Sequence, residues 1–163
     1  MRTPPGASTM RGMTGVRGLV AVALALLLGG CAVGEQHRDP AEVAASLSDA
    51  GDQAASAVTT VRTAVRLLGE DRITPAVADT TQADSIRVLE QATRTLTTLS
   101  PPDAATGQTR DELLAAVQDA TTAVVAAGAW ITGGPAARTE VPPQVLRDLD
   151  AAAGAVSQLA AAA

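Results

Sequence analysis

The chain has 163 residues, of which 12 are basic, 17 are acidic and 47% are hydrophobic, and it holds one Trp, no Phe and no Tyr. All 12 basic residues are arginines, and there is a single His and a single Cys. These counts exclude metal sites built from clustered His or Cys, and they leave little material for a nucleophile with a histidine base.

The first 30 residues have the pattern of an export signal. Arg2, Arg11 and Arg17 precede an uncharged apolar run of eleven residues, 18–28. A helix of that length spans about 16 Å, roughly half of a hydrocarbon core, so the run fits a signal sequence better than a transmembrane helix. We therefore exclude residues 1–30 from the predicted fold.

The only cysteine directly follows the small residues that close this run, in the order Leu28-Gly29-Gly30-Cys31. These four residues resemble the lipobox of bacterial lipoproteins, and the resemblance covers residues 1–31 only. It implies that the Cys31 thiol is acylated with diacylglycerol and that the signal is cut just before it. Two acyl chains, palmitate for example, anchor a protein stably where one chain would be marginal.

Cys31 has an alternative interpretation as a free thiol, either beside an ordinary secretory cleavage site or in an uncleaved anchor. A lone cysteine has no intramolecular disulfide partner, and an exported compartment is oxidising. Acylation removes that reactive thiol, so lipidation is the preferred hypothesis. The expected location is the cell membrane, lipid-anchored on the extracytoplasmic face within the cell envelope.

The part that follows the signal is acidic. Three of the 12 arginines precede Cys31, which leaves 9 arginines against all 17 acids and a net charge near −8. Nucleic acid and anionic lipid headgroups repel such a chain, so we expect no nucleic-acid partner and membrane attachment through acylated Cys31 alone. Residues 31–39 are interpreted as the lipidated cysteine and a short tether, which contains the only histidine, His37.

Four helices are predicted in the remaining domain, residues 40–163. The first, over about 40–68, begins with a capping Asp39 followed by Pro40, and Gly69 ends it. One apolar seam runs along it at alternating spacings of four and three, through Val43, Leu47, Ala50, Ala54, Ala57, Val61, Ala64 and Leu68.

The second helix, over about 75–99, follows Thr74 by the same cap-then-proline pattern, and only its later half is apolar, at Ile86, Leu89, Ala92, Leu96 and Leu99. The third is predicted over about 101–131, with Ser100 as the cap and Asp103 three residues later, a spacing that resembles a capping box. Its start could lie anywhere from Pro101 to Thr109. Its seam is formed by Leu113, Val117, Ala120, Val124, Ala127 and Ile131.

A Gly- and Pro-rich loop separates the third helix from a fourth over about 142–161. The seam of that helix is Val145, Leu149, Ala152, Val156, Leu159 and Ala163. Four amphipathic helices with short connections predict an all-α fold, an antiparallel up-down-up-down four-helix bundle.

No catalytic residue, metal ligand or cofactor site is predicted. Three carboxylate pairs occur, and each lies at a helix end or on a polar face with an arginine nearby: Glu70-Asp71, Asp111-Glu112 and Asp148 with Asp150. Solvated charge is the expected state of such pairs. Threonine clusters such as Thr59-Thr60 are interpreted as solvated helix faces. We therefore expect a protein that is not an enzyme and that carries no cofactor.

One end of the predicted bundle is a candidate contact surface. The first and third connections meet at the end opposite the anchor, and they carry Trp130, Arg72 and Arg138. Trp and Arg are enriched among the residues that dominate protein interfaces, so these three are candidate partner contacts. The alternative is that Trp130 closes the end of the core.

Two functions remain open at this point. The favoured one is a non-catalytic lipoprotein that serves as a protein-interaction or accessory module at the outer face of the cytoplasmic membrane. The alternative is a carrier that opens the bundle and binds a small apolar ligand or lipid along the seams. The absence of Phe and Tyr argues against a specific enclosed pocket. The identity of a small-molecule ligand is open.

Overall fold

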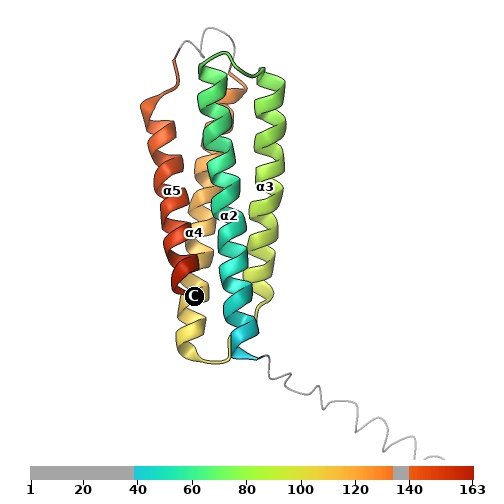
Figure 1. Ribbon diagram of the computed structural model, residues 1–163, viewed down its shortest axis with the longest axis vertical. Coiled ribbons are helices and arrows are strands. Elements are labelled where there is room, and N and C mark those ends of the chain that lie inside the picture. Colours follow the sequence, from blue (N-terminus) through green and yellow to red (C-terminus); the bar gives the residue numbers. More distant parts are fainter. Residues whose placement is uncertain (1–38, 134–139) are drawn as a thin grey trace, which may run out of the picture. The chain divides into compact units, whose positions relative to one another are not determined.

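The computed structural model describes residues 39–133 and 140–163, which form four α-helices and contain no strand. These are α2 (Pro40–Gly69), α3 (Pro75–Thr98), α4 (Ala104–Ile131) and α5 (Pro143–Ala162). Successive helices run in opposite directions (Figure 1). Each helix packs against the next in the chain, α5 closes onto α2, and α2 also contacts α4 across the bundle. The predicted up-down-up-down four-helix bundle is confirmed.

Helix starts follow the predicted combination of a capping residue with proline. Proline occupies the first turn of α2, α3 and α5, where its missing N–H costs no helical hydrogen bond. The Asp39 carboxylate accepts a hydrogen bond from the backbone N–H of Ala41 at 3.0 Å, and the Thr74 hydroxyl accepts one from Val77 at 3.4 Å. The observed bounds of α2, α3 and α5 lie within one residue of the predicted ones.

The predicted cap of the third helix is wrong. α4 begins at Ala104, within the predicted range of Pro101 to Thr109, and its cap is Asp103 rather than Ser100. Ser100 and Pro101 each precede a proline, and a following proline disfavours helical backbone angles. Pro102 lies past this restriction but has no side-chain hydrogen-bond acceptor, so Asp103 is the first residue there that can cap the helix. Its carboxylate accepts hydrogen bonds from the backbone N–H and the side chain of Thr106, which hold the pKa of Asp103 below its ordinary value of 3.8.

The core consists of the predicted seams. Every seam residue of α2 and α4 is buried, and α2 also buries Gly51, Ala55, Val58 and Val65 because three helices pack around it. In α3, Ile86 is half-buried and the four residues that follow it in the seam are buried. In α5, Leu149 and Val156 are buried, and the other predicted seam residues are half-buried. The alternating spacing therefore identifies the inward side of α2, α4 and α5, and apolar residues three or four positions apart identify it in the later half of α3.

The polar first half of α3 packs through small residues and hydrogen bonds. Ala78 and Ser85 are buried there, and the Ser85 hydroxyl donates to the carbonyl of Thr81 at 2.9 Å. The Gln82 amide reaches across to donate to the Val124 carbonyl of α4 at 3.2 Å, in space left open by the missing side chain of Gly128. Val77, the large apolar residue on the α2 side of this half of α3, is 51% exposed.

α4 is long and apolar enough to cross a membrane, judged by length and composition. The same property is found in core helices of bundles, and α4 contacts all three of the other described helices with its seam buried. Within the described residues, its apolar character is therefore explained by its place in the core.

Candidate functional site

The two connections that form the predicted contact surface lie at the same end of the bundle. The turn between α2 and α3 and the described parts of the α4–α5 connection lie together there (Figure 1). Arg72 is exposed, and its Nη1 lies 3.4 Å from Glu70 Oε2 in the same turn. Arg138 lies outside the described residues. Trp130 and Arg72 therefore share one end of the bundle.

Trp130 is only 8% exposed, because it closes the end of the core. Its indole N–H donates a hydrogen bond to the Glu140 carbonyl at 3.2 Å, which ties the segment before α5 to the end of α4. Gly69 leaves the space in which Val141 packs, and a Cβ placed at Gly69 would lie 3.8 Å from Trp130 Cη2. The partner-contact role of Trp130 stays a prediction, and Arg72 is exposed at the same end of the bundle.

The turn after α2 is fixed by a backbone motif rather than by glycine conformation. Asp71 has φ 54°, in the left-handed region that Asp tolerates better than most residues. The Arg72 N–H donates to the Leu67 carbonyl at 2.9 Å and the Asp71 N–H to the Leu68 carbonyl at 3.1 Å, the two bonds of a Schellman motif. Gly69 ends α2 as predicted, but its role is to admit Val141.

The lipobox residues Leu28, Gly29 and Gly30, together with Cys31 and His37, lie outside the described residues. Lipidation of Cys31 accordingly stays a prediction from sequence.

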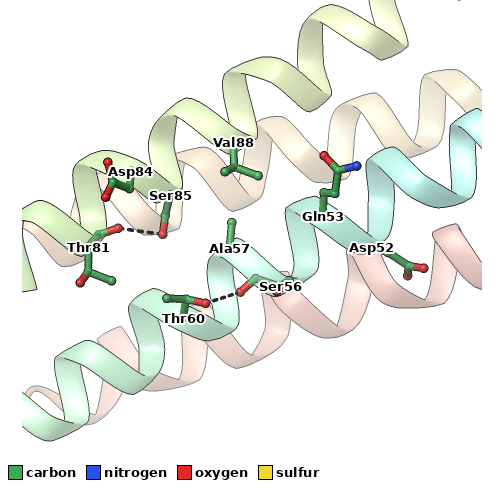
Figure 2. A pocket seen from close by; sticks show the side chains of 9 residues that line it. All are labelled: Asp52, Gln53, Ser56, Ala57, Thr60, Thr81, Asp84, Ser85 and Val88. Atoms are coloured by element: carbon green, nitrogen blue, oxygen red, sulfur yellow. Dashed lines mark hydrogen bonds between the residues drawn. The ribbon is translucent and has the colours of Figure 1, made fainter.

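A surface groove between α2 and α3 is the largest hollow described, and sequence analysis did not predict it. Its first part has a volume of about 700 Å³. Figure 2 shows the side chains that form it, which are Asp52, Gln53, Ser56, Ala57 and Thr60 from α2 and Thr81, Asp84, Ser85 and Val88 from α3. Ala57 and Val88 face each other between the helices, with polar side chains on both sides.

A second hollow of about 440 Å³ continues this groove toward the turn between α2 and α3. The two hollows share Ser56, Thr60 and Thr81, and the second adds Thr59, Thr63, Ala64, Leu67, Ile73 and Val77. We call the two together the α2–α3 groove. Its second part is the more apolar, and Val77 is 51% exposed there.

Most hydroxyl groups in the α2–α3 groove already donate their proton to the backbone of their own helix. Six of the residues that line the groove carry hydroxyl groups, and five of these hydroxyls donate to the carbonyl four residues earlier in their own helix, at 2.8–2.9 Å: Thr59, Thr60, Thr63, Thr81 and Ser85. A hydroxyl has one proton and two lone pairs. These side chains therefore offer the groove hydrogen-bond acceptors and few donors.

The charged residues that line the α2–α3 groove are both acidic. Asp52 lies on the α2 side and Asp84 on the α3 side, and no arginine belongs to the lining of either hollow. Asp84 pairs with the exposed Arg87, whose Nη1 lies 2.8 Å from Asp84 Oδ1. The groove is thus rich in acceptors and negative in charge, above an apolar floor.

Two further surface hollows are smaller. One between α3 and α4, of about 420 Å³, contains Glu90 and Arg94, whose charged atoms lie 3.9 Å apart. Another, of about 280 Å³, lies beside Ile131 at the end that carries Trp130. Glu90 and Arg94 offset each other in the first of these, and the second has Asp79 as its only charged lining residue and less than half the volume of the first part of the α2–α3 groove.

Carboxylates of the three predicted pairs face solvent with arginines beside them. Arg110 lies 2.7 Å from Asp111, Arg62 lies 2.5 Å from Asp150, and Arg66 lies 3.9 Å from Glu70. Among residues 39–133 and 140–163, no group of three or more His, Cys, Asp or Glu side chains is placed to hold a metal ion. The surface feature best formed for binding is therefore the α2–α3 groove.

Comparison of the chain with models of known families, with curated proteins and with solved structures finds no match.

Proposed function

We propose that this protein is an exported lipoprotein, held at the extracytoplasmic face of the cell membrane by acyl chains on Cys31, whose helical bundle docks a protein partner without catalysing a reaction. The lipobox sequence Leu28-Gly29-Gly30-Cys31 supports the anchor. The bundle begins at Pro40, nine residues after Cys31. Nine extended residues reach at most about 32 Å, so the anchor would keep the bundle close to the bilayer.

The single observation that carries the docking role is the α2–α3 groove. Its volume of about 700 Å³ in the first part alone lies on the surface, between two helices whose inward sides are packed. The seam residues fill the described interior, and several of them, including Val61, Leu89 and Val117, are 0% exposed. This packing supports binding on the surface over the alternative of a carrier that encloses a ligand.

Replacing Cys31 with alanine should abolish lipid labelling, because the variant has no thiol for the diacylglyceryl group. The test is growth of a bacterial host with a palmitate analogue, followed by fractionation and intact mass measurement. Wild type is expected in the membrane fraction, labelled, with Cys31 as its first residue. Cys31→Ala is expected unlabelled and uncleaved.

A second substitution, Cys31→Ser, keeps a side chain of similar size at this position. Cys31→Ser should behave as Cys31→Ala does, since the hydroxyl does not replace the thiol in the lipidation reaction. Label retained in either variant, or a wild-type protein cleaved elsewhere and released without lipid, would contradict the anchor. Docking is tested separately, by photo-cross-linking in intact cells from Thr60, which lines both parts of the groove.

A further inference from the structure

The α2–α3 groove is long enough to hold a helix. It extends from Asp52 to Leu67 along α2, and α3 runs antiparallel beside it. At a rise of 1.5 Å per residue this length is about 22 Å, which a helix of about 15 residues would match. Helices that lie in grooves bind through an apolar face with anchors three and four residues apart.

Hydrogen-bond chemistry disfavours an anionic occupant. Five of the six hydroxyl groups donate within their own helices, so a phosphate or carboxylate in the α2–α3 groove would meet mostly lone pairs, with the Gln53 amide and the Ser56 hydroxyl as the side-chain donors left in the lining. Asp52 and Asp84 would add direct repulsion. An occupant must therefore bring hydrogen-bond donors of its own. Guanidinium and ammonium groups suit this, because they donate hydrogen bonds and accept none.

The charges on the two sides of the groove are available to such an occupant. Asp52 takes part in none of the ion pairs found in the described residues. Asp84 is paired with Arg87, but both side chains are more than half exposed, at 58% and 74%. An exposed pair of this kind contributes little to stability, so an incoming cation can replace Arg87 at small cost.

The floor of the groove adds an apolar requirement. Ala57 and Val88 face each other in its first part (Figure 2), and Val77 is 51% exposed in its second part. Half-buried Leu67 and Ile73 extend this apolar surface toward the turn. A fully polar cationic segment would leave this surface uncovered. Charge and apolar surface together require an occupant that is amphipathic as well as basic.

We propose that the α2–α3 groove binds a basic amphipathic helix of a partner protein, with Arg or Lys side chains toward Asp52 and Asp84 and an apolar face against Ala57, Val88 and Val77. This inference rests on the proposed docking function and specifies the class of partner. The acidic balance of the whole domain adds attraction at long range, whereas the groove determines where the helix lies.

The test uses the full chain in detergent micelles and three synthetic helical peptides of about 15 residues. All three share one apolar face, and their polar faces carry Arg, Gln or Glu. Each peptide has a fluorophore and a photo-reactive group on its apolar face, and binding to empty micelles is subtracted. The Arg peptide is expected to bind most tightly, to weaken as salt increases, and to cross-link to residues of α2 and α3 that line the groove.

Matched variants separate the groove from general charge attraction. Asp52→Asn with Asp84→Asn should weaken Arg-peptide binding about tenfold, which corresponds to about 1.4 kcal/mol. The control, Asp119→Asn with Asp148→Asn, removes the same charge from exposed positions on α4 and α5 and should weaken it by less than about threefold. Unchanged melting temperatures in both double variants would show that the fold is intact.

Three results would overturn the inference: equal binding of the three peptides, equal losses in the two double variants, or cross-links outside the groove. If the Arg peptide does not bind while Thr60 still captures a partner in cells, the docking function stands and the basic-helix inference is wrong. If Thr60 captures nothing and no peptide binds, both are wrong.

Discussion

Replacing Gly51 with leucine should destabilise the bundle by about 3 kcal/mol or more, because α5 packs directly against α2 at this position. A Cβ added at Gly51 would lie 2.5 Å from Ala160 Cβ and 3.3 Å from Ala160 Cα. The second atom belongs to the backbone, so rotation of a side chain cannot relieve the contact. Chemical denaturation followed by circular dichroism would measure the loss, with a fall in Tm of about 10 °C.

The matched control is Gly154→Leu, in the middle of α5. A Cβ at Gly154 meets nothing within 4 Å, and the residue is exposed. Leucine should therefore stabilise the protein there by up to about 1 kcal/mol, since glycine is a poor helix former. Equal effects of the two substitutions would contradict the close packing of α2 on α5.

Replacing Trp130 with alanine should cost about 3 kcal/mol, because it leaves a cavity at the end of the core. The side chain is 8% exposed and its N–H is bonded to the Glu140 carbonyl at 3.2 Å. Trp130→Phe is the control, since it keeps an aromatic ring and loses the hydrogen bond, and it should cost about 1 kcal/mol beyond the smaller ring volume. Thermal unfolding of both variants would measure these losses.

Stability and partner capture of Trp130→Ala together distinguish a contact role of Trp130 from a structural one. If Trp130→Ala keeps the stability of wild type and loses partner capture, Trp130 is a contact residue and the end of the bundle is the docking surface. If stability falls and capture from the α2–α3 groove persists at low temperature, Trp130 is a structural residue. The burial of Trp130 favours the second result.

Most of the fold could be predicted because each helix carries its own evidence. Alternating spacings of four and three identify the buried side of α2 and α4 without any knowledge of their partners. Proline at the first turn fixes the starts of α2, α3 and α5. The predicted cap of α4 is wrong because Ser100 and Asp103 both have cap chemistry, and the restriction that the two prolines place on Ser100 and Pro101 decides between them.

Features that depend on two helices at once could not be predicted from one periodic pattern. Gly51 resembles any interior glycine in the sequence, and its contact with Ala160 depends on the register of α2 against α5. The α2–α3 groove likewise depends on Ala57 facing Val88, residues that lie 31 positions apart in the chain. Thr59 and Thr60 were interpreted as a solvated face, and both line the groove while remaining exposed.

One signal of the groove was present in the sequence. The first half of α3 has few large apolar residues, and the sequence places the apolar positions of this helix in its later half. In the bundle this half packs through Ala78, Gln82 and Ser85, so it leaves a hollow beside α2. A polar half-helix opposite a complete apolar seam is therefore a pattern that predicts a surface groove.

Photo-cross-linking in intact cells tests the docking role most directly. A photo-reactive residue at Thr60 would lie in the α2–α3 groove, and one at Ala151 would lie on the exposed side of α5. We predict one discrete protein adduct from Thr60 in wild type, little from Ala151, and loss of the Thr60 adduct in Cys31→Ala. Equal capture from both positions, or no adduct from Thr60 in properly anchored protein, would contradict the proposed docking function.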